Sequence, residues 1–347
     1  MAYISFQPSD NYNTKLYTGT AGAGQSYTGL GFAPDRVWSK SRTAANNSGV
    51  YDSVRGVEKL LYGNEPNAQT TTTDCLATFG SDGITFGANG TIGDSSDFVN
   101  WCWKMGTTTG IAGSPSITPS SYSFNATAGQ SIIAYTGTGV NATLPHGLGV
   151  APECIIVKKL SDSDNWNVGH QNMKTSSPWD WAAKLNTTAA PADDNTIWND
   201  TAPTSTLFSI GTSTEVNNST STYIAYCFAP VKGYSKFGSY QGNGNANGSF
   251  TYTGFRPGFL MIKRTNTGGQ WMIFDDKRLG YNERNYDFQA SNSNAERTTG
   301  PWMDILSNGF KIRSTDTDFN GGGDSMFYAA FAAYPTVSSN NLPGVAR

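Results

Sequence analysis

Short apolar runs separated by polar, glycine-rich segments dominate this chain. The clearest are 154–157 (Cys-Ile-Ile-Val) and 259–262 (Phe-Leu-Met-Ile), each closely preceded by a proline and followed by a lysine. Such bounded runs are typical of strands covered on both faces. The aromatic runs 98–103, 223–229 and 327–332 predict further strands. A convincing amphipathic helical period is missing, and a single helical turn is expected only at 181–185.

Three sets of landmark residues recur with constant internal spacing. In each set a Tyr-x-Gly triplet is followed by a proline 17 positions after the tyrosine and a lysine six positions after the proline. The landmarks are Tyr17, Pro34 and Lys40, then Tyr135, Pro152 and Lys158, then Tyr240, Pro257 and Lys263. Constant spacing within the sets, with unequal offsets between them, predicts tandem units with variable loops.

The predicted fold class is all-β, with three tandem pseudo-repeats of β-sandwich or jelly-roll-like modules. The predicted divisions are a lead-in (1–13), unit 1 (14–106), a Gly/Ser/Thr/Pro linker (107–129), unit 2 (130–234), unit 3 (235–335) and a C-terminal tail (336–347). Tyr122 and Phe124 alternate with serines, which suggests an added strand before unit 2. Two arrangements stay open: side by side about a local threefold axis, or in a row.

Bulk composition narrows the classes of partner. The net charge is −3 and the basic residues are scattered, so nucleic-acid binding is not expected. A stretch of about 18 apolar residues is missing, which argues against membrane insertion. The first residues lack the basic region and apolar core of a signal peptide, so synthesis in the cytoplasm and release by lysis are expected. Four cysteines are too few for a disulfide scaffold; buried thiols are expected, although Cys75–Cys102 and Cys154–Cys227 pairs stay open.

Candidate catalytic groups are sparse. The two histidines, His146 and His170, are expected in turns or on the surface. The carboxylates that could act alone, as in glycoside hydrolases, lie in Asn- and Ser-rich segments and read as solvated loop acids. They are Asp275 with Asp276, Asp162 with Asp164, and Asp193 with Asp194. We therefore expect no enzymatic activity, with polysaccharide degradation as the remaining enzymatic alternative.

One loop resembles the start of a calcium-binding loop. Residues 316–321 read D-x-D-x-N-G, and the ligand candidates are Asp316, Asp318, Asn320 and Asp324. At position twelve, where a bidentate glutamate is required, the chain has Phe327. A polar hairpin loop is the competing interpretation. Apart from this possible structural calcium, no cofactor is expected.

An aromatic-rich insert in unit 2 is the candidate contact site. It contains Trp179, Trp181, Asp193, Asp194 and Trp198. Exposed indoles beside Asp and Asn side chains suit a glycan, because the ring stacks on the apolar face of a sugar. The alternatives are a subunit contact and ordinary core packing.

Aspartate and arginine recur together in two units, as Asp52 with Arg55 and Asp275 with Arg278. An ion pair that bridges a turn explains this recurrence without a ligand.

The combined motifs are similar to those of a known group of proteins. They are Tyr-Thr-Gly, Gly-Leu-Gly-Phe-Ala-Pro-Asp, Val-Trp-Ser-Lys, Tyr-Asp-Ser-Val-Arg-Gly and Trp-Cys-Trp-Lys in unit 1, with 223–228 and 233–240 later and 6–14 at the start. Together they resemble an uncharacterised lectin-like β-sandwich repeat family of structural and tail-fibre-like proteins of marine and cyanobacterial tailed phages.

The resemblance implies a non-enzymatic protein on the exterior of a virion, as a tail fibre or spike component or a capsid decoration. Its expected partners are other virion proteins, including copies of itself. The alternative is a host-recognition adhesin that binds a cell-surface glycan.

Overall fold

The computed structural model describes residues 6–278, 282 and 286–334. These residues confirm the all-β prediction, since helices are limited to short turns. The predicted lead-in contains η1 (Pro8–Asp10) and the start of β1 (Tyr12–Thr18), which joins the sheet of unit 1. The other elements of unit 1 are β2 (Gln25–Thr28), β3 (Arg36–Ser41), β4 (Gly49–Asp52), β5 (Lys59–Tyr62), β6 (Thr70–Thr71), β7 (Leu76–Phe79), β8 (Gly83–Phe86) and β9 (Asp97–Trp103). The predicted tail, 336–347, lies outside the described residues.

Units 2 and 3 continue the pattern of short strands. Strand β10 (Ser121–Asn125) lies within the predicted linker and joins the sheet of unit 2. Unit 2 itself has β11 (Gln130–Thr136), β12 (Ala142–Pro145), β13 (Cys154–Lys159), β14 (Asn167–His170), η2 (Pro178–Asp180), β15 (Trp181–Lys184), β16 (Ala192–Asp193), α1 (Asn195–Trp198), β17 (Leu207–Ile210), α2 (Thr214–Asn217) and β18 (Thr222–Phe228). Unit 3 has β19 (Ser235–Gln241), β20 (Phe250–Tyr252), β21 (Pro257–Arg264), β22 (Met272–Asp275), β23 (Phe288–Gln289), β24 (Met303–Leu306), β25 (Gly309–Ile312), α3 (Thr317–Asn320) and β26 (Ser325–Ala332).

The larger sheets share one strand order. They run β1-β9-β3-β4-β5-β6 in unit 1, β10-β11-β18-β13-β14-β15-β16 in unit 2 and β19-β26-β21-β22-β23 in unit 3. Each unit adds a smaller sheet: β2-β8-β7, β12-β17 or β20-β25-β24. Strand β10 pairs along the edge of β11, as the alternation in 121–125 suggested. The expected helical turn at 181–185 is wrong: Trp181–Lys184 is strand β15, because pairing with β14 and β16 decides its conformation.

The central strands of each larger sheet are buried on both faces. In β13, Ile155 and Val157 face the smaller sheet of unit 2, whereas Cys154 and Ile156 face the centre of the molecule. Side chains alternate between the two faces of a strand, so one apolar run can serve two cores. The prediction of doubly covered strands is confirmed, since every residue of β3 and of β13 is buried.

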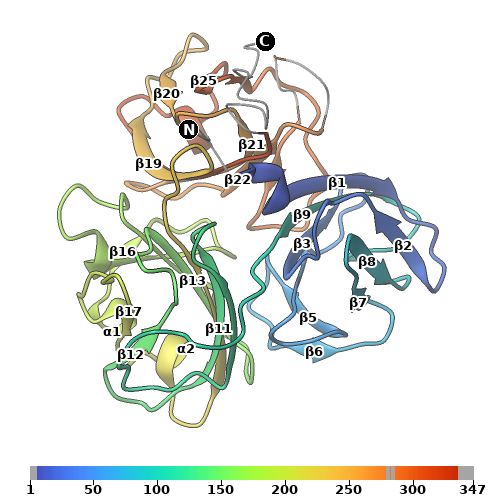
Figure 1. The fold of residues 1–347 in the computed structure, drawn as a ribbon. Coiled ribbons are helices and arrows are strands. Elements are labelled where there is room, and N and C mark those ends of the chain that lie inside the picture. The colour runs from blue at the N-terminus through green and yellow to red at the C-terminus, as the bar shows by residue number, and fades with distance from the viewer. Residues whose placement is uncertain (1–5, 279–281, 283–285, 335–347) are drawn as a thin grey trace, which may run out of the picture.

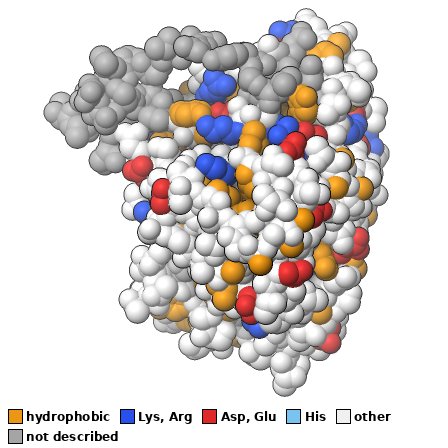
Figure 2. Space-filling model, turned by 90° about the vertical axis from the view of Figure 1, so that its right-hand side faces the viewer, with side chains coloured by type: hydrophobic (Ala, Val, Ile, Leu, Met, Phe, Trp, Pro, Cys, Tyr) orange, Lys and Arg blue, Asp and Glu red, His pale blue; other side chains and the backbone are white. Residues whose placement is uncertain are grey.

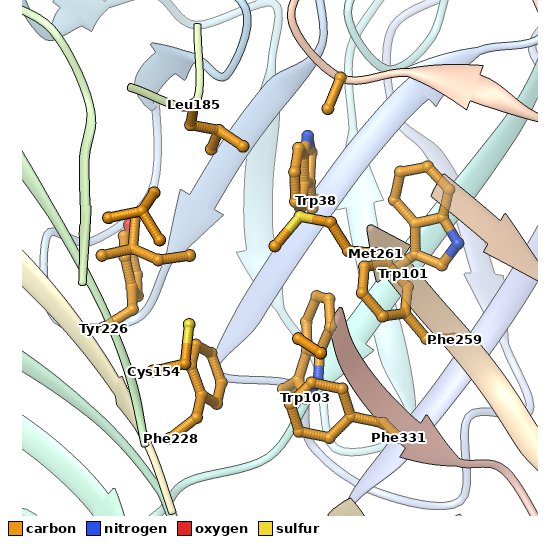
Figure 3. Close-up of a cluster of buried hydrophobic side chains, with 14 of the residues drawn as sticks. Trp38, Trp101, Trp103, Cys154, Leu185, Tyr226, Phe228, Phe259, Met261 and Phe331 are labelled. Carbon is orange, nitrogen blue, oxygen red and sulfur yellow. The ribbon is translucent and has the colours of Figure 1, made fainter. Parts of the chain in front are cut away.

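The units pack side by side around a shared aromatic core (Figure 1). Figure 3 shows side chains from all three larger sheets pointing toward one another there, among them Trp38 and Trp103 of unit 1, Phe228 of unit 2, and Phe259 and Phe331 of unit 3. The rings of Phe228 and Phe331 lie 5.5 Å apart, and those of Trp103 and Phe259 lie 5.4 Å apart. Each unit therefore helps to bury its neighbours as well as its own sandwich.

The landmark tyrosines make the same contact in each unit. Tyr17, Tyr135 and Tyr240 each donate a hydrogen bond of 2.5–2.7 Å to a backbone carbonyl, those of Ile92, Val216 and Phe319 respectively. The glycine two positions later is also required. A Cβ on Gly19 would lie 1.9 Å from the carbonyl oxygen of Asp94, and one on Gly137 or Gly242 would lie 2.4 Å from a backbone oxygen. The recurrent Tyr-x-Gly triplet thus closes each sandwich at its end.

Candidate functional site

The landmark lysines connect the units in a closed cycle. The Lys40 Nζ of unit 1 donates to the backbone oxygen of Ser293 in unit 3, at 2.8 Å. Likewise, Lys158 of unit 2 donates to Pro66 in unit 1 at 3.0 Å, and Lys263 of unit 3 donates to Thr188 in unit 2 at 3.2 Å. Each ammonium group also donates to a carbonyl of its own loop: Asn46, Asp164 or Gly269. The three unit interfaces are therefore built alike.

These lysines are almost fully buried and bind carbonyl oxygens rather than carboxylates. Burial lowers the pKa of each ammonium group to about 8, because the low-dielectric surroundings disfavour the charge. The carbonyl hydrogen bonds oppose this effect. A flexible stem with several donors suits such a junction, since one side chain joins two loops of different units.

A second cycle runs in the opposite direction. Asp52 of unit 1 accepts a hydrogen bond from the Tyr226 hydroxyl of unit 2, at 2.7 Å. The strand end that matches it in unit 3, Asp275, accepts from the Trp101 indole of unit 1, at 3.1 Å. In unit 2 the matching residue is His170, whose Nε2 lies 3.1 Å from the backbone carbonyl oxygen of Tyr328 in unit 3.

The predicted aspartate–arginine pairs are confirmed, and both are buried. Asp52 Oδ2 lies 2.5 Å from Arg55 Nε, and Asp275 Oδ2 lies 2.6 Å from Arg278 Nε. Arg278 lowers the pKa of the Asp275 carboxyl although burial opposes this effect. Each carboxylate also accepts the backbone N–H of its arginine, so the pair fixes the turn after the strand. These pairs belong to the interfaces between units.

The two histidines are not in exposed turns, and that expectation is wrong. His146 directly follows β12 and His170 is the last residue of β14, and both are fully buried because tertiary packing covers these strand ends. Burial lowers the pKa of His146 to about 4 and that of His170 to about 3. In both rings Nδ1 accepts a backbone N–H two residues later, which holds the neutral form. They act here as uncharged hydrogen-bonding groups.

The cysteines and loop acids take structural positions. All four cysteines are buried free thiols, so neither open disulfide pairing occurs. Burial raises the pKa of Cys102 and Cys154 to about 12. Asp275 and Asp276 are buried rather than solvated. In contrast, Asp162 is exposed and lies 3.1 Å from Lys159.

The calcium-like motif forms a capped helical turn. Asp316 is the N-cap of α3 and accepts the backbone N–H of Asp318. The matching turn of unit 2, α2, is capped in the same way by Ser213. Asn320 and its counterpart Asn217 are buried, and each donates to two backbone carbonyls.

The carboxylates of this motif have separate protein partners. Asp316 pairs with Arg297, Asp318 accepts the Gln270 N–H, and Asp324 pairs with Arg264. Within 6–278, 282 and 286–334, no group of three or more His, Cys, Asp or Glu side chains is placed to hold a metal ion. These carboxylates therefore already have protein partners, and calcium binding by Asp316, Asp318, Asn320 and Asp324 stays a prediction.

The tryptophan insert is mostly core, which corrects the expectation of exposed indoles. Trp179 and Trp198 are 2% and 0% exposed and meet edge to face, with ring centroids 5.9 Å apart. Trp181 is half-buried, with the Lys174 ammonium 4.2 Å from its ring centroid. Asp194 caps α1 and Asp193 is exposed in β16. Buried rings offer no face for sugar stacking.

Two adjoining hollows lie where unit 2 meets unit 3. The larger, about 710 Å³, is lined by the segment after β14, by residues of β19 and β26, and by Thr265 and Asn266, which follow β21. The smaller, about 430 Å³, lies between β19 and β20. Both are lined by Asn172, Ser239 and Tyr240, so they form one groove. Sequence reasoning missed this groove because its walls come from two units.

The outer surface is mixed in character. Figure 2 shows one face on which hydrophobic side chains form scattered small patches, with acidic and basic side chains interspersed. None of the helices in the described part of the chain has the length and apolar character needed to cross a membrane.

A family model spans all three units and both kinds of sheet. It is a domain of unknown function, DUF7483, and it matches residues 7–335. The chain belongs to the DUF7483 family. Neither the curated proteins nor the solved structures compared with it contain a match. The DUF7483 match treats the three units as one domain, in line with their shared central core.

Proposed function

We propose that this DUF7483 protein is a non-enzymatic structural component of the exterior of a bacteriophage particle. It acts by assembly and by presenting its outer loops. The observation that carries the proposal is the closed cycle of buried contacts between the units, in which three lysines and three strand-end residues repeat one interface. A block built in this way resists separation of its parts.

The pseudo-threefold arrangement also suits a symmetric particle. Virus shells and tails present threefold and sixfold positions, and symmetric assemblies select partners with matching interfaces. A single chain with three similar outer sheets can contact three neighbours at such a position. The resemblance of the landmark motifs to tail-fibre-like phage proteins supports the same assignment.

The test is the location of the protein in purified particles. We expect an antibody against the recombinant chain, detected with gold, to label the particle surface after gradient purification of a lysate. The protein should remain with the particles through the gradient. Recovery of the protein only in the soluble fraction, with unlabelled particles, would refute the proposal.

A further inference from the structure

The groove between units 2 and 3 has the size and the chemistry of a ligand site. Its two hollows, of about 710 and 430 Å³, fall in the range of small-molecule pockets, roughly 300–1,000 Å³. Strand β19 runs along both hollows, so the groove is elongated.

The lining is rich in neutral hydrogen-bonding groups. Side-chain amides come from Gln171, Asn172, Gln241 and Asn266, and hydroxyls from Thr175, Ser239 and Ser325, among others. Among the described residues, the charged ones in the lining are lysines alone: Lys174 in the larger hollow and Lys236 in the smaller one. Amides and hydroxyls in this density match the hydroxyl groups of sugars.

Two exposed aromatic side chains lie at one end of the groove. Phe250 and Tyr252 are 48% and 57% exposed, while Thr251 between them is buried. The two rings therefore lie on the same face of β20. Lys236 donates to the Tyr252 backbone oxygen at 2.7 Å, and its ammonium lies 5.3 Å from the ring centroid. This contact ties Tyr252 to β19.

The fold itself does not require these aromatic residues. Phe250 pairs with Lys311, and Tyr252 pairs with Gly309 at the hairpin turn. The matching pairs in unit 1 contain Ser26 and Thr28, and those in unit 2 contain Thr143 and Pro145. Two units thus build the same small strand with small or polar residues. Unit 3 alone exposes a pair of rings there.

We propose that this groove binds an oligosaccharide, with Phe250 and Tyr252 stacking on sugar rings. The amides of Gln241 and Asn266, whose nitrogens already donate to Gly323 and Asp324, would bind sugar hydroxyl groups through their remaining hydrogen-bonding positions. Aromatic rings stack on the apolar face of a sugar while polar neighbours fix its orientation. The inference goes beyond the proposed structural role, since sugar binding and particle location are measured separately.

The test uses the full chain, labelled and applied to an array of purified bacterial capsular and O-antigen polysaccharides. The key variant is F250S/Y252T, which introduces the residues of unit 1. The matched control is Val140→Ser, which removes another exposed apolar side chain, 63% exposed, outside the groove. We expect the wild type and V140S to bind the same polysaccharides and F250S/Y252T to lose at least tenfold in affinity.

A second variant, Q241A/N266A, removes two amides and leaves the aromatic rings, and we expect a several-fold loss. Thermal unfolding shows whether each variant is folded. If F250S/Y252T is unfolded, the polysaccharide affinity of Q241A/N266A tests the proposal instead. Binding of no polysaccharide by the wild type, or equal binding by the folded variants, overturns the proposal. A third result would also overturn it: the protein binds no polysaccharide but binds an extended peptide with the β10 sequence, Ser-Tyr-Ser-Phe-Asn. The groove would then serve to add a peptide strand to β19.

Discussion

Acidification should weaken the junction between units 2 and 3 through His170. This ring is fully buried, its Nε2 donates to the Tyr328 oxygen, and its Nδ1 accepts the Asn172 N–H at 3.0 Å. The bond that Nδ1 accepts is compatible only with the neutral ring, because protonation at Nδ1 would turn this acceptor into a donor facing the Asn172 N–H. Burial lowers its pKa from 6.5 to about 3, whereas the unfolded chain keeps the ordinary value.

The sign follows from proton linkage. Between pH 6.5 and pH 3 the unfolded chain binds a proton at His170 that the folded chain does not bind. The free energy of unfolding therefore falls as the pH falls through this window. At about pH 4.5 the contribution is a loss of about 2.7 kcal/mol relative to neutral pH.

The assay is urea unfolding of the wild type and of His170→Gln at about pH 7.5 and pH 4.5. Glutamine keeps a donor for the Tyr328 oxygen and does not titrate. Since the carboxylates titrate alike in both proteins, their effects cancel in the difference. We expect the wild-type advantage in unfolding free energy to shrink by about 2.7 kcal/mol on acidification. An advantage that is equal at the two pH values would refute the reasoning.

Further predictions concern the interfaces and cores. Gly137→Ala should lower the melting temperature by several degrees, since its Cβ would lie 2.4 Å from the Asn218 oxygen; an unchanged melting curve would contradict this. Asp275→Ala should lower the free energy of unfolding, measured in urea, by about 3–5 kcal/mol, because it breaks the buried ion pair with Arg278. Asp324→Ala, which breaks a half-buried pair with Arg264, should lower it by about 1 kcal/mol or less. Equal losses of unfolding free energy in the two variants would contradict the expected effect of burial. Trp179→Ala should cost about 3–5 kcal/mol as a core truncation, and a loss below about 1 kcal/mol would show that the ring is not core.

Local pattern was sufficient for the strands that the apolar and aromatic runs mark, although not for β15. The runs after Pro152 and Pro257 are buried on both faces, as predicted. This burial could be predicted because the apolar content of a run is a property of a few consecutive residues. The pairing of Asp52 with Arg55 was also readable, since the partners lie three positions apart. The constant spacing of the landmark residues likewise indicated where matching contacts would recur.

Long-range contacts determined the rest. Lys158 reaches Pro66, 92 positions away, and His170 meets Tyr328, 158 positions away. Composition cannot reveal such partners, because burial depends on which sheet faces are brought together by packing around the common centre. The same packing buried Trp179 and Trp198 and created the groove beside β19. Periodicity along the chain thus specifies which residues can be covered, and the docking of the three sheets specifies what covers them.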